Sequence, residues 1–238
     1  MVMKLHAGDE PGYITRYRRN LLFELPLLRR PEQLWLPDVP TVIYTADGPC
    51  RRGGHHDGRR ARCQAIMKHY GFTNWRFFFG RPGRPYWQAI VADWIQLLGS
   101  WDPPVLILED DIEPRAFQPG IDVPTGSQVV YLGGGRGGES QGVRAGGTIG
   151  LFPKKRWRYG YIDINHDWFR CFGMWYSHAI LFLDRRSMTD LAVLLCAADR
   201  PIDSVLARNQ WRWNCVCRKV PMFWQNDGHH LAETYSYF

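Results

Sequence analysis

The 238-residue sequence lacks the long apolar segments that mark membrane-spanning and exported proteins. No run approaches the roughly 18 apolar residues that a spanning helix requires. The first ten residues contain no continuous apolar stretch like that of a signal peptide. We therefore expect a cytoplasmic protein without a transmembrane segment.

A zinc-binding arrangement of cysteines is also absent. The six cysteines form no paired C-x-x-C motif, which argues against a structural zinc site. Cys63 and Cys196 fall within predicted helices. We therefore expect reduced thiols that are mostly structural, as is usual in cytosolic proteins.

Several well-known catalytic and nucleotide-binding motifs are missing: Walker A, H-E-x-x-H and G-x-S-x-G. Residues 133–138 do satisfy G-x-G-x-x-G after a predicted strand, but the polar residues 139–142 continue a loop and start no helix. A dinucleotide site is therefore not expected. The nine glycines of residues 133–150 predict a mobile loop, either a lid over a substrate or a plain disordered segment.

Positive charge and aromatic side chains are abundant. The net charge is +7, the pI is about 9.2, and aromatic residues make up 14% of the chain, with eleven tryptophans. This balance predicts an anionic partner, which includes phosphates, nucleic acid, acidic glycans and membrane headgroups. Residues 154–161 interleave cations with aromatic rings, which suits nucleic acid or sugar rings, or else an ordinary exposed strand.

Predicted strands and helices alternate along the chain, which indicates an α/β fold. We predict a single domain at residues 41–238, with a mixed, mainly parallel sheet flanked by helices. Residues 1–40 are predicted to be an N-terminal extension packed on the core. A capping box starting at Ser187 is predicted to open the last long helix. The predicted strands are 41–46, 75–79, 105–108, 128–132 and 178–183, and the other predicted helices cover Cys63 to Tyr70 and residues 86–98.

An acidic triplet ends the most apolar of these strands. Val105 to Leu108 predict a buried strand, and Glu109, Asp110 and Asp111 follow it directly. Side chains alternate along a strand, so Glu109 and Asp111 are expected on one face and Asp110 on the other. Adjacent carboxylates at the end of a core strand favour a bound cation, and Mn²⁺ or Mg²⁺ suits them, whereas the alternative is a plain acidic loop.

Two further segments carry candidate ligands. The arginines of residues 51–62 could cradle a diphosphate through bidentate hydrogen bonds, or they form a solvated basic loop. His229 and His230, near the C-terminus, are either incidental surface residues or further ligands of a carboxylate-bound metal.

In order and spacing these motifs resemble GT-A type glycosyltransferases, and most of all the family-25 enzymes of lipopolysaccharide biosynthesis, from Thr41 to about His230. Leu108 to Asp111 match the L-E-D-D motif of that family. The glycine-rich residues 133–150 and the insertion at 51–58 depart from its pattern and leave the acceptor open. Weaker points of likeness are Arg59 to Arg62 opening a helix, Tyr131-Leu132-Gly133, Ser177 to Leu181, Pro201-Ile202-Asp203 and Pro221 to Gln225.

The resemblance implies a GT-A (Rossmann-like) fold and a nucleotide-sugar donor, a UDP-hexose, whose diphosphate is bridged by Mn²⁺ or Mg²⁺. It makes Asp111 the principal metal ligand, supported by Asp110 and Glu109, with His229 or His230 completing the coordination. Such enzymes are described as inverting, which requires a carboxylate base. Asp203 is the first candidate, with helix capping as its alternative role, and Asp167 is the reserve. The nucleotide-sugar is expected to contact Thr45, Asp47, Arg51, Arg52, Arg59, Arg62, Glu109 and Asp110.

Two acceptors remain open: a bacterial surface glycan, and hydroxylated bases in phage-type modified DNA. Accordingly, the protein is expected in the cytoplasm of a bacterium or of a phage-infected host, where an anionic membrane surface is a further candidate partner. The alternative functions are a non-catalytic nucleic-acid-binding protein and a metal-dependent phosphotransferase or nuclease.

Overall fold

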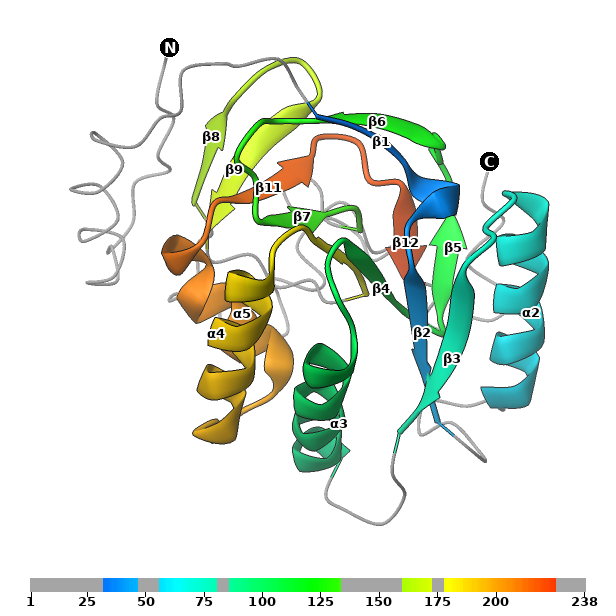
Figure 1. The fold of residues 1–238 in the computed structure, drawn as a ribbon, viewed down its shortest axis with the longest axis horizontal. Coiled ribbons are helices and arrows are strands. Elements are labelled where there is room, and N and C mark those ends of the chain that lie inside the picture. The colour runs from blue at the N-terminus through cyan, green and yellow to red at the C-terminus, as the bar shows by residue number, and fades with distance from the viewer. Residues whose placement is uncertain (1–31, 47–55, 81–85, 134–159, 173–177, 226–238) are drawn as a thin grey trace, which may run out of the picture.

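The computed structural model describes residues 32–46, 56–80, 86–133, 160–172 and 178–225. Figure 1 shows a central sheet with helices on both sides. The helices are α2 (His56–His69), α3 (Tyr86–Ser100), α4 (Arg185–Cys196) and α5 (Ile202–Asn209), with short 3-10 helices at Leu36–Asp38 (η1) and Gln210–Arg212 (η4).

The first half of the domain forms where the sequence pattern predicts it. β2 (Thr41–Thr45) leads through α2 to β3 (Trp75–Phe79), and α3 then leads to β4 (Val105–Glu109). Both β3 and β4 pair parallel to β2, on opposite sides of it. α2 is followed by a turn at Gly71, whose φ of 73° lies in the left-handed region that glycine enters without a Cβ clash.

The whole sheet is mixed, and the expectation that it is mainly parallel is wrong. Three strand pairs are parallel and four are antiparallel, because β10 runs antiparallel between β4 and β7 and because β8 and β9 close the far edge as an antiparallel pair. The order is β3-β2-β4-β10-β7-β11-β9-β8, with β7 at Val129–Tyr131, β8 at Gly160–Asp163, β9 at Trp168–Phe172, β10 at Ala179–Phe182 and β11 at Cys215–Arg218.

Two small antiparallel sheets complete the structure. β1 (Glu32–Trp35) pairs with β6 (Gly120–Val123), and β5 (Ile112–Pro114) pairs with β12 (Phe223–Gln225). Residues 32–40 of the expected N-terminal extension do pack on the core, since Leu36 and Val39 are buried. Residues 1–31 of that extension lie outside the described residues.

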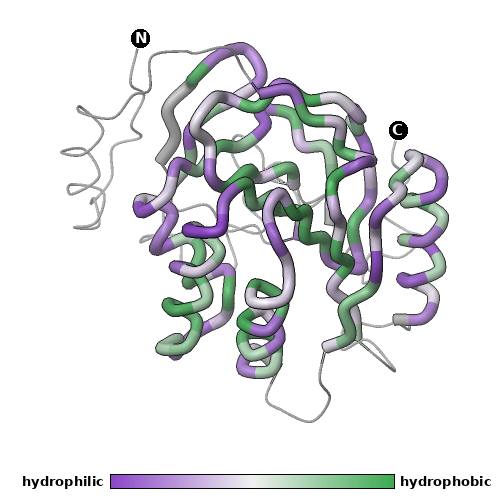
Figure 2. Tube along the Cα trace, in the orientation of Figure 1, coloured by the Kyte–Doolittle hydropathy of each residue, from purple (hydrophilic) through white to green (hydrophobic). Residues whose placement is uncertain are grey.

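Each face of the large sheet is covered by its own hydrophobic cluster. One cluster joins β4, β7, β9, β10 and β11 to α3, α4 and α5. The other joins the opposite face to α2 and to the two small sheets. In Figure 2 the central strands are coloured hydrophobic, whereas the helices alternate between hydrophobic and hydrophilic positions. Within the described segments, no helix has the length and apolar character needed to cross a membrane.

The start of α4 differs from the predicted capping box. Asp184 is the N-cap residue, and its side chain accepts a hydrogen bond of 2.8 Å from the backbone N–H of Ser187. Ser187 is therefore the third helical residue and does not cap the helix. An aspartate three residues ahead of Ser187 satisfies the same backbone donors, so the helix begins earlier than the serine suggests.

Candidate functional site

The carboxyl ends of β2 and β4 lie at the point where the chain reverses its direction of travel across the sheet. From β2 the chain passes to β3 on one side and then to β4 on the other. The connecting helices α2 and α3 belong to the clusters on opposite faces. In open α/β sheets such a topological switch point is the usual place for a ligand.

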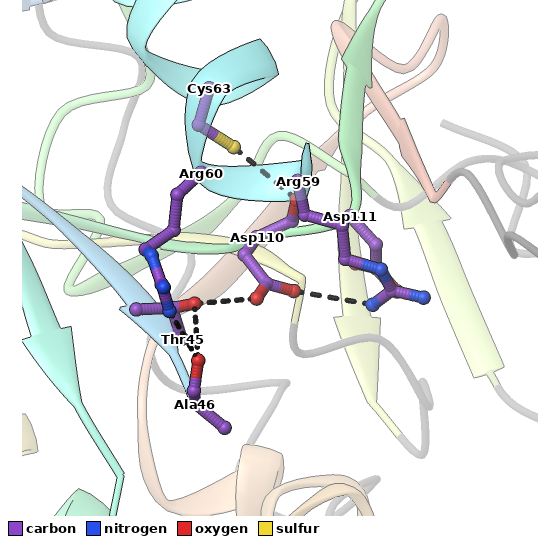
Figure 3. A network of polar contacts seen from close by, with 7 residues as sticks. All are labelled: Thr45, Ala46, Arg59, Arg60, Cys63, Asp110 and Asp111. Carbon is purple, nitrogen blue, oxygen red and sulfur yellow. Dashed lines mark hydrogen bonds and ion pairs between the residues drawn. The ribbon is translucent and has the colours of Figure 1, made fainter. Parts of the chain in front are cut away.

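Asp110 lies at this position and is held by two donors. The Thr45 hydroxyl donates a hydrogen bond of 2.6 Å to Asp110 Oδ2, and Arg59 Nη1 donates one of 3.2 Å to Oδ1 (Figure 3). The thiol of Cys63 donates to the Asp110 backbone carbonyl at 3.3 Å. Asp110 is only 5% exposed, so these partners supply hydrogen bonds that water would otherwise provide.

Asp111 joins the same cluster, which corrects the expected alternation of the triplet. Arg59 Nη1 lies 3.7 Å from Asp111 Oδ2, and Asp111 is 6% exposed. β4 ends at Glu109 and the next two residues form a turn, so both aspartates face Arg59. The alternation of β4 instead places Glu109 with Val105 and Ile107, on the face that α3 covers.

Cys63 lies among four charged groups. Burial raises the pKa of its thiol from 9.0 to about 12. The positive charges of Arg62 and Arg59 lower this pKa by smaller amounts, and the negative charges of Asp110 and Asp111 raise it. Charges on α2 and directly after β4 therefore act on one buried atom. The thiol is protonated at neutral pH and serves as a hydrogen-bond donor.

Arg60 belongs to the arginines of residues 51–62 but was not among the residues expected to contact the nucleotide-sugar, although it neighbours Arg59 in the sequence. Its Nη1 donates a hydrogen bond of 2.6 Å to the carbonyl of Ala46, directly after β2, and it forms an ion pair with Asp57. Its guanidinium also lies 5.4 Å from the centre of the Phe79 ring. Successive arginines at the start of α2 thus bind the ends of two neighbouring strands, Arg59 at β4 and Arg60 at β2.

A buried histidine that the sequence analysis did not single out as a site residue lies next to the acidic strand end. The carbonyl of His178 accepts a 3.0 Å hydrogen bond from the Glu109 N–H, and its ring Nε2 lies 3.3 Å from the carbonyl of Phe223. Gly133 packs so closely on the ring that a Cβ there would collide with it. The only sequence signal for this residue is its position at the start of a predicted strand.

The two candidate bases lie on different parts of the sheet. Asp203 is the second residue of α5 and Pro201 is the N-cap, so the alternative role of Asp203 as the helix cap is wrong. Its charge contributes to the raised pKa of Tyr131, which is due mainly to burial. Asp167 lies in the turn between β8 and β9, four strand positions from β4, which is about 19 Å along the sheet.

The structure therefore brings together Thr45, Arg59, Asp110 and Asp111, and it does not bring Glu109 or Asp167 to this cluster. Arg62 directly precedes Cys63 and its charge acts on that thiol. Within the described segments, no group of three or more His, Cys, Asp or Glu side chains is arranged to hold a metal ion. The predicted triplet does not form such a group because Glu109 faces away. Asp47, Arg51, Arg52, His229 and His230 lie outside the described residues.

Comparison with known proteins adds no family assignment. No protein-family model matches this chain. No curated protein is similar enough to it to count as a relative. The likeness to family-25 glycosyltransferases therefore stays a prediction based on the residues that carry it.

Proposed function

We propose that this chain is a metal-dependent glycosyltransferase. It would move a hexose from a nucleotide-sugar, a UDP-sugar, to a hydroxyl group on an anionic macromolecular acceptor. The observation that carries the proposal is the Asp110–Asp111 pair, held by Thr45 and Arg59 at the switch point between β2 and β4. Carboxylates beside arginines at such an edge suit a metal-bound diphosphate.

The donor set fits one hard divalent cation with Asp111 as the main protein ligand. Both oxygens of Asp110 already accept hydrogen bonds, from Thr45 and Arg59, so Asp110 supports the site by fixing its neighbours. A carboxylate oxygen is the preferred ligand for Mn²⁺ or Mg²⁺. When bound, the ion would stabilise the negative charge of the leaving diphosphate.

The described part of the chain ends close to this position, ahead of the C-terminal histidines in the sequence. Gln225, the last residue of β12, pairs with Ile112, which directly follows Asp111. His229 is four residues further along the chain, a distance that spans at most about 14 Å. The chain thus leaves the described region beside Asp111, which supports the expectation that His229 or His230 completes the coordination.

The arginines of α2 would bind and orient the donor. Arg59 already contacts both carboxylates, so it can neutralise one of their charges and offer its remaining donors to a phosphate. Arg62 is three residues further along the same helix and has a half-buried side chain. Together they would hold an anionic diphosphate where two bare aspartates alone would repel it.

Asp203 remains the better candidate for the catalytic base. Its charge is one of the smaller causes that raise the pKa of Tyr131, the last residue of β7. β7 and β4 both run antiparallel to β10, so their carboxyl ends share one edge, two strand positions or about 10 Å apart. A carboxylate at this edge would accept the proton of an acceptor hydroxyl as the new glycosidic bond forms.

The test is a screen of nucleotide-sugars that follows nucleotide release and sugar transfer with Mn²⁺. Asp111→Asn should lower turnover by about 100-fold or more, because the metal supplies several kcal/mol of charge stabilisation. Asp122→Asn, an exposed aspartate on β6, is the matched control and should keep full activity. Unchanged turnover in Asp111→Asn would contradict the site.

The same screen separates the alternative functions. Cleavage of nucleic acid or transfer of phosphate without sugar transfer would favour a phosphotransferase or nuclease. Binding of DNA without binding of nucleotide or Mn²⁺ would favour a non-catalytic nucleic-acid-binding protein. For the enzyme itself, activity on hydroxylated DNA that falls steeply with salt identifies a DNA acceptor, and activity on a lipid-linked glycan identifies the surface glycan.

A further inference from the structure

An aromatic side chain that the proposed reaction does not use lies in line with the carboxylate pair. Phe79 is the last residue of β3 and is 50% exposed, although it is a large apolar ring. β3 is an edge strand of the large sheet. An exposed aromatic side chain at the carboxyl end of an edge strand is available to a ligand.

Phe79 belongs to a row of three side chains that crosses three parallel strands. It pairs in register with Thr45 on β2, and neighbouring residues in register share a face of the sheet. The Thr45 hydroxyl in turn binds Asp110, just after β4. From Phe79 to Asp110 the row spans two strand spacings, about 10 Å. That span is comparable to a nucleotide laid from its base to its phosphates.

The Phe79 ring is held firmly in place. Trp75, Phe77 and Phe79 form a ladder along one face of β3, with ring centres 5.5 Å and 6.2 Å apart. The Arg60 guanidinium lies 5.4 Å from the Phe79 ring centre and is itself fixed by the Ala46 carbonyl. A rigid ring flanked by a cation gives a flat base a surface on which to stack.

The chain after β3 is fixed as well. The N–H of Gly80 donates a 2.7 Å hydrogen bond to the Thr45 carbonyl. A Cβ on Gly80 would lie 2.8 Å from the Tyr44 hydroxyl and 2.9 Å from Asp93 Oδ2, so only glycine fits without a shift. The contacts of Gly80 with β2 and α3 therefore fix the backbone directly after Phe79.

We propose that Phe79 and Arg60 form a stacking platform for a nucleobase, with the adjoining phosphates directed toward Thr45 and the Asp110–Asp111 pair. The placement of the phosphates rests on the proposed function. A nucleobase has two sources here: the donor nucleotide, or a base of a polynucleotide acceptor. The shared chemistry is a planar heterocycle beside a phosphate.

The experiment measures binding by titration calorimetry, with Mn²⁺ present, for the full-length protein and its variants. The probes are UDP, ribose 5-phosphate, and a single-stranded oligothymidylate of about a dozen nucleotides. Phe79→Ala should weaken binding of at least one base-containing probe by about 5-fold or more, because a base stacked on an aromatic ring is stabilised to that extent. Binding of ribose 5-phosphate, which has no base, should not change.

Three further variants make the result specific. Phe79→Trp keeps an aromatic face and should retain binding, whereas Phe79→Leu keeps apolar packing and should lose it. Trp35→Ala removes an equally exposed aromatic ring on β1 and should have no effect. Thermal unfolding of each variant shows whether the fold is intact, and the Leu and Trp variants keep the test valid if the alanine variant unfolds.

Each outcome decides the proposal. A loss for UDP alone assigns the platform to the donor, and a loss for the oligonucleotide alone assigns it to a polynucleotide. Equal losses for UDP and ribose 5-phosphate, or no loss for any base-containing probe, overturn it. If Phe79→Ala weakens binding only of the base-containing probes and the protein transfers no sugar, the glycosyltransferase proposal is overturned and the stacking platform is supported. Sugar transfer together with unchanged affinity for every base-containing probe in Phe79→Ala overturns the platform and leaves the transferase proposal standing.

Discussion

The parallel and antiparallel ends of the large sheet use their residues differently. In β3–β2–β4 the strands run the same way, so their carboxyl ends meet at one edge and bring Phe79, Thr45 and Asp110 into line. In β11–β9–β8 the direction alternates. The inward-facing residues there are apolar, and Phe169, Cys171, Cys215 and Cys217 are fully buried.

This contrast shows where binding residues can gather. Aligned strand ends collect polar groups from distant parts of the chain at one place, with helix α2 adding arginines above them. Alternating strand ends distribute polar groups over both edges and leave the interior to packing. We therefore expect substitutions at the parallel end to affect charge and binding, and substitutions at the antiparallel end to affect the core.

The largest expected difference comes from removing one carboxylate at each end. Asp110→Ala should lower the free energy of unfolding by about 3–5 kcal/mol, because it leaves the mostly buried Arg59 without its closest partner. Asp167→Ala, in the exposed turn of the antiparallel end, should change it by less than about 0.5 kcal/mol. Urea denaturation at pH 7 measures both, and similar losses would contradict the contrast.

A smaller difference is expected from removing one buried hydroxyl in each half of the sheet. Thr45→Val removes the hydroxyl that donates to the charged carboxylate of Asp110, and should lower the free energy of unfolding by about 2 kcal/mol. Tyr131→Phe, on β7, removes the hydroxyl oxygen that accepts a 2.8 Å hydrogen bond from the neutral amide of Gln210. It should lower the free energy of unfolding by about 1 kcal/mol.

The same denaturation experiment compares these two variants, and a Tyr131→Phe loss that exceeds that of Thr45→Val would reverse the ranking. Thr45→Val should also weaken binding of the nucleotide-sugar, whereas Tyr131→Phe should leave that affinity unchanged. Equal effects on affinity would mean that Thr45 contributes only to stability.

The last expected difference appears only at alkaline pH. Burial raises the pKa of Cys63 to about 12, so an unfolded chain loses this proton near pH 9 while the folded chain keeps it. Stability from this group is therefore fully present below pH 9 and falls between pH 9 and about 12, by about 1.4 kcal/mol per pH unit.

Burial also raises the pKa values of Cys171, Cys215 and Cys217, so the antiparallel end contributes more of this alkaline loss than the parallel end. Cys63→Ala should reduce the dependence of unfolding free energy on pH above 9, and Cys171→Ala combined with Cys215→Ala should reduce it further. A dependence unchanged by either variant would show that other groups control alkaline unfolding.

The sequence predicted the local elements better than their pairing. Apolar periodicity located α3 and β4, and the acidic residues after β4 do lie beside an arginine-rich helix. The antiparallel insertion of β10 could not be predicted, since it depends on contacts between segments some 70 residues apart. Strand pairing of this kind leaves no local pattern.

The candidate site could be predicted only in part, again because strand pairing leaves no local pattern in the sequence. Asp110, Asp111, Arg59 and Arg62 were identified from their residue types. Their grouping with Thr45, 65 residues away from Asp110, follows from register across two strands. The prediction that Asp111 lies on the opposite face from Asp110 was wrong, because the chain turns directly after Glu109 and no longer alternates its side chains as a strand does. Phe79 was missed because an aromatic residue in a strand normally predicts core, and only the edge position of β3 exposes it.

The close contact between Gly133 and the His178 ring has a consequence for how variation can accumulate in this chain. Any side chain at residue 133 must displace a buried ring that lies beside the carbonyl of Phe223 and on the strand that pairs with β4. Gly58 and Gly99 have no neighbours where a Cβ would extend. Homologous chains should therefore tolerate substitution at residues 58 and 99 and keep glycine at 133.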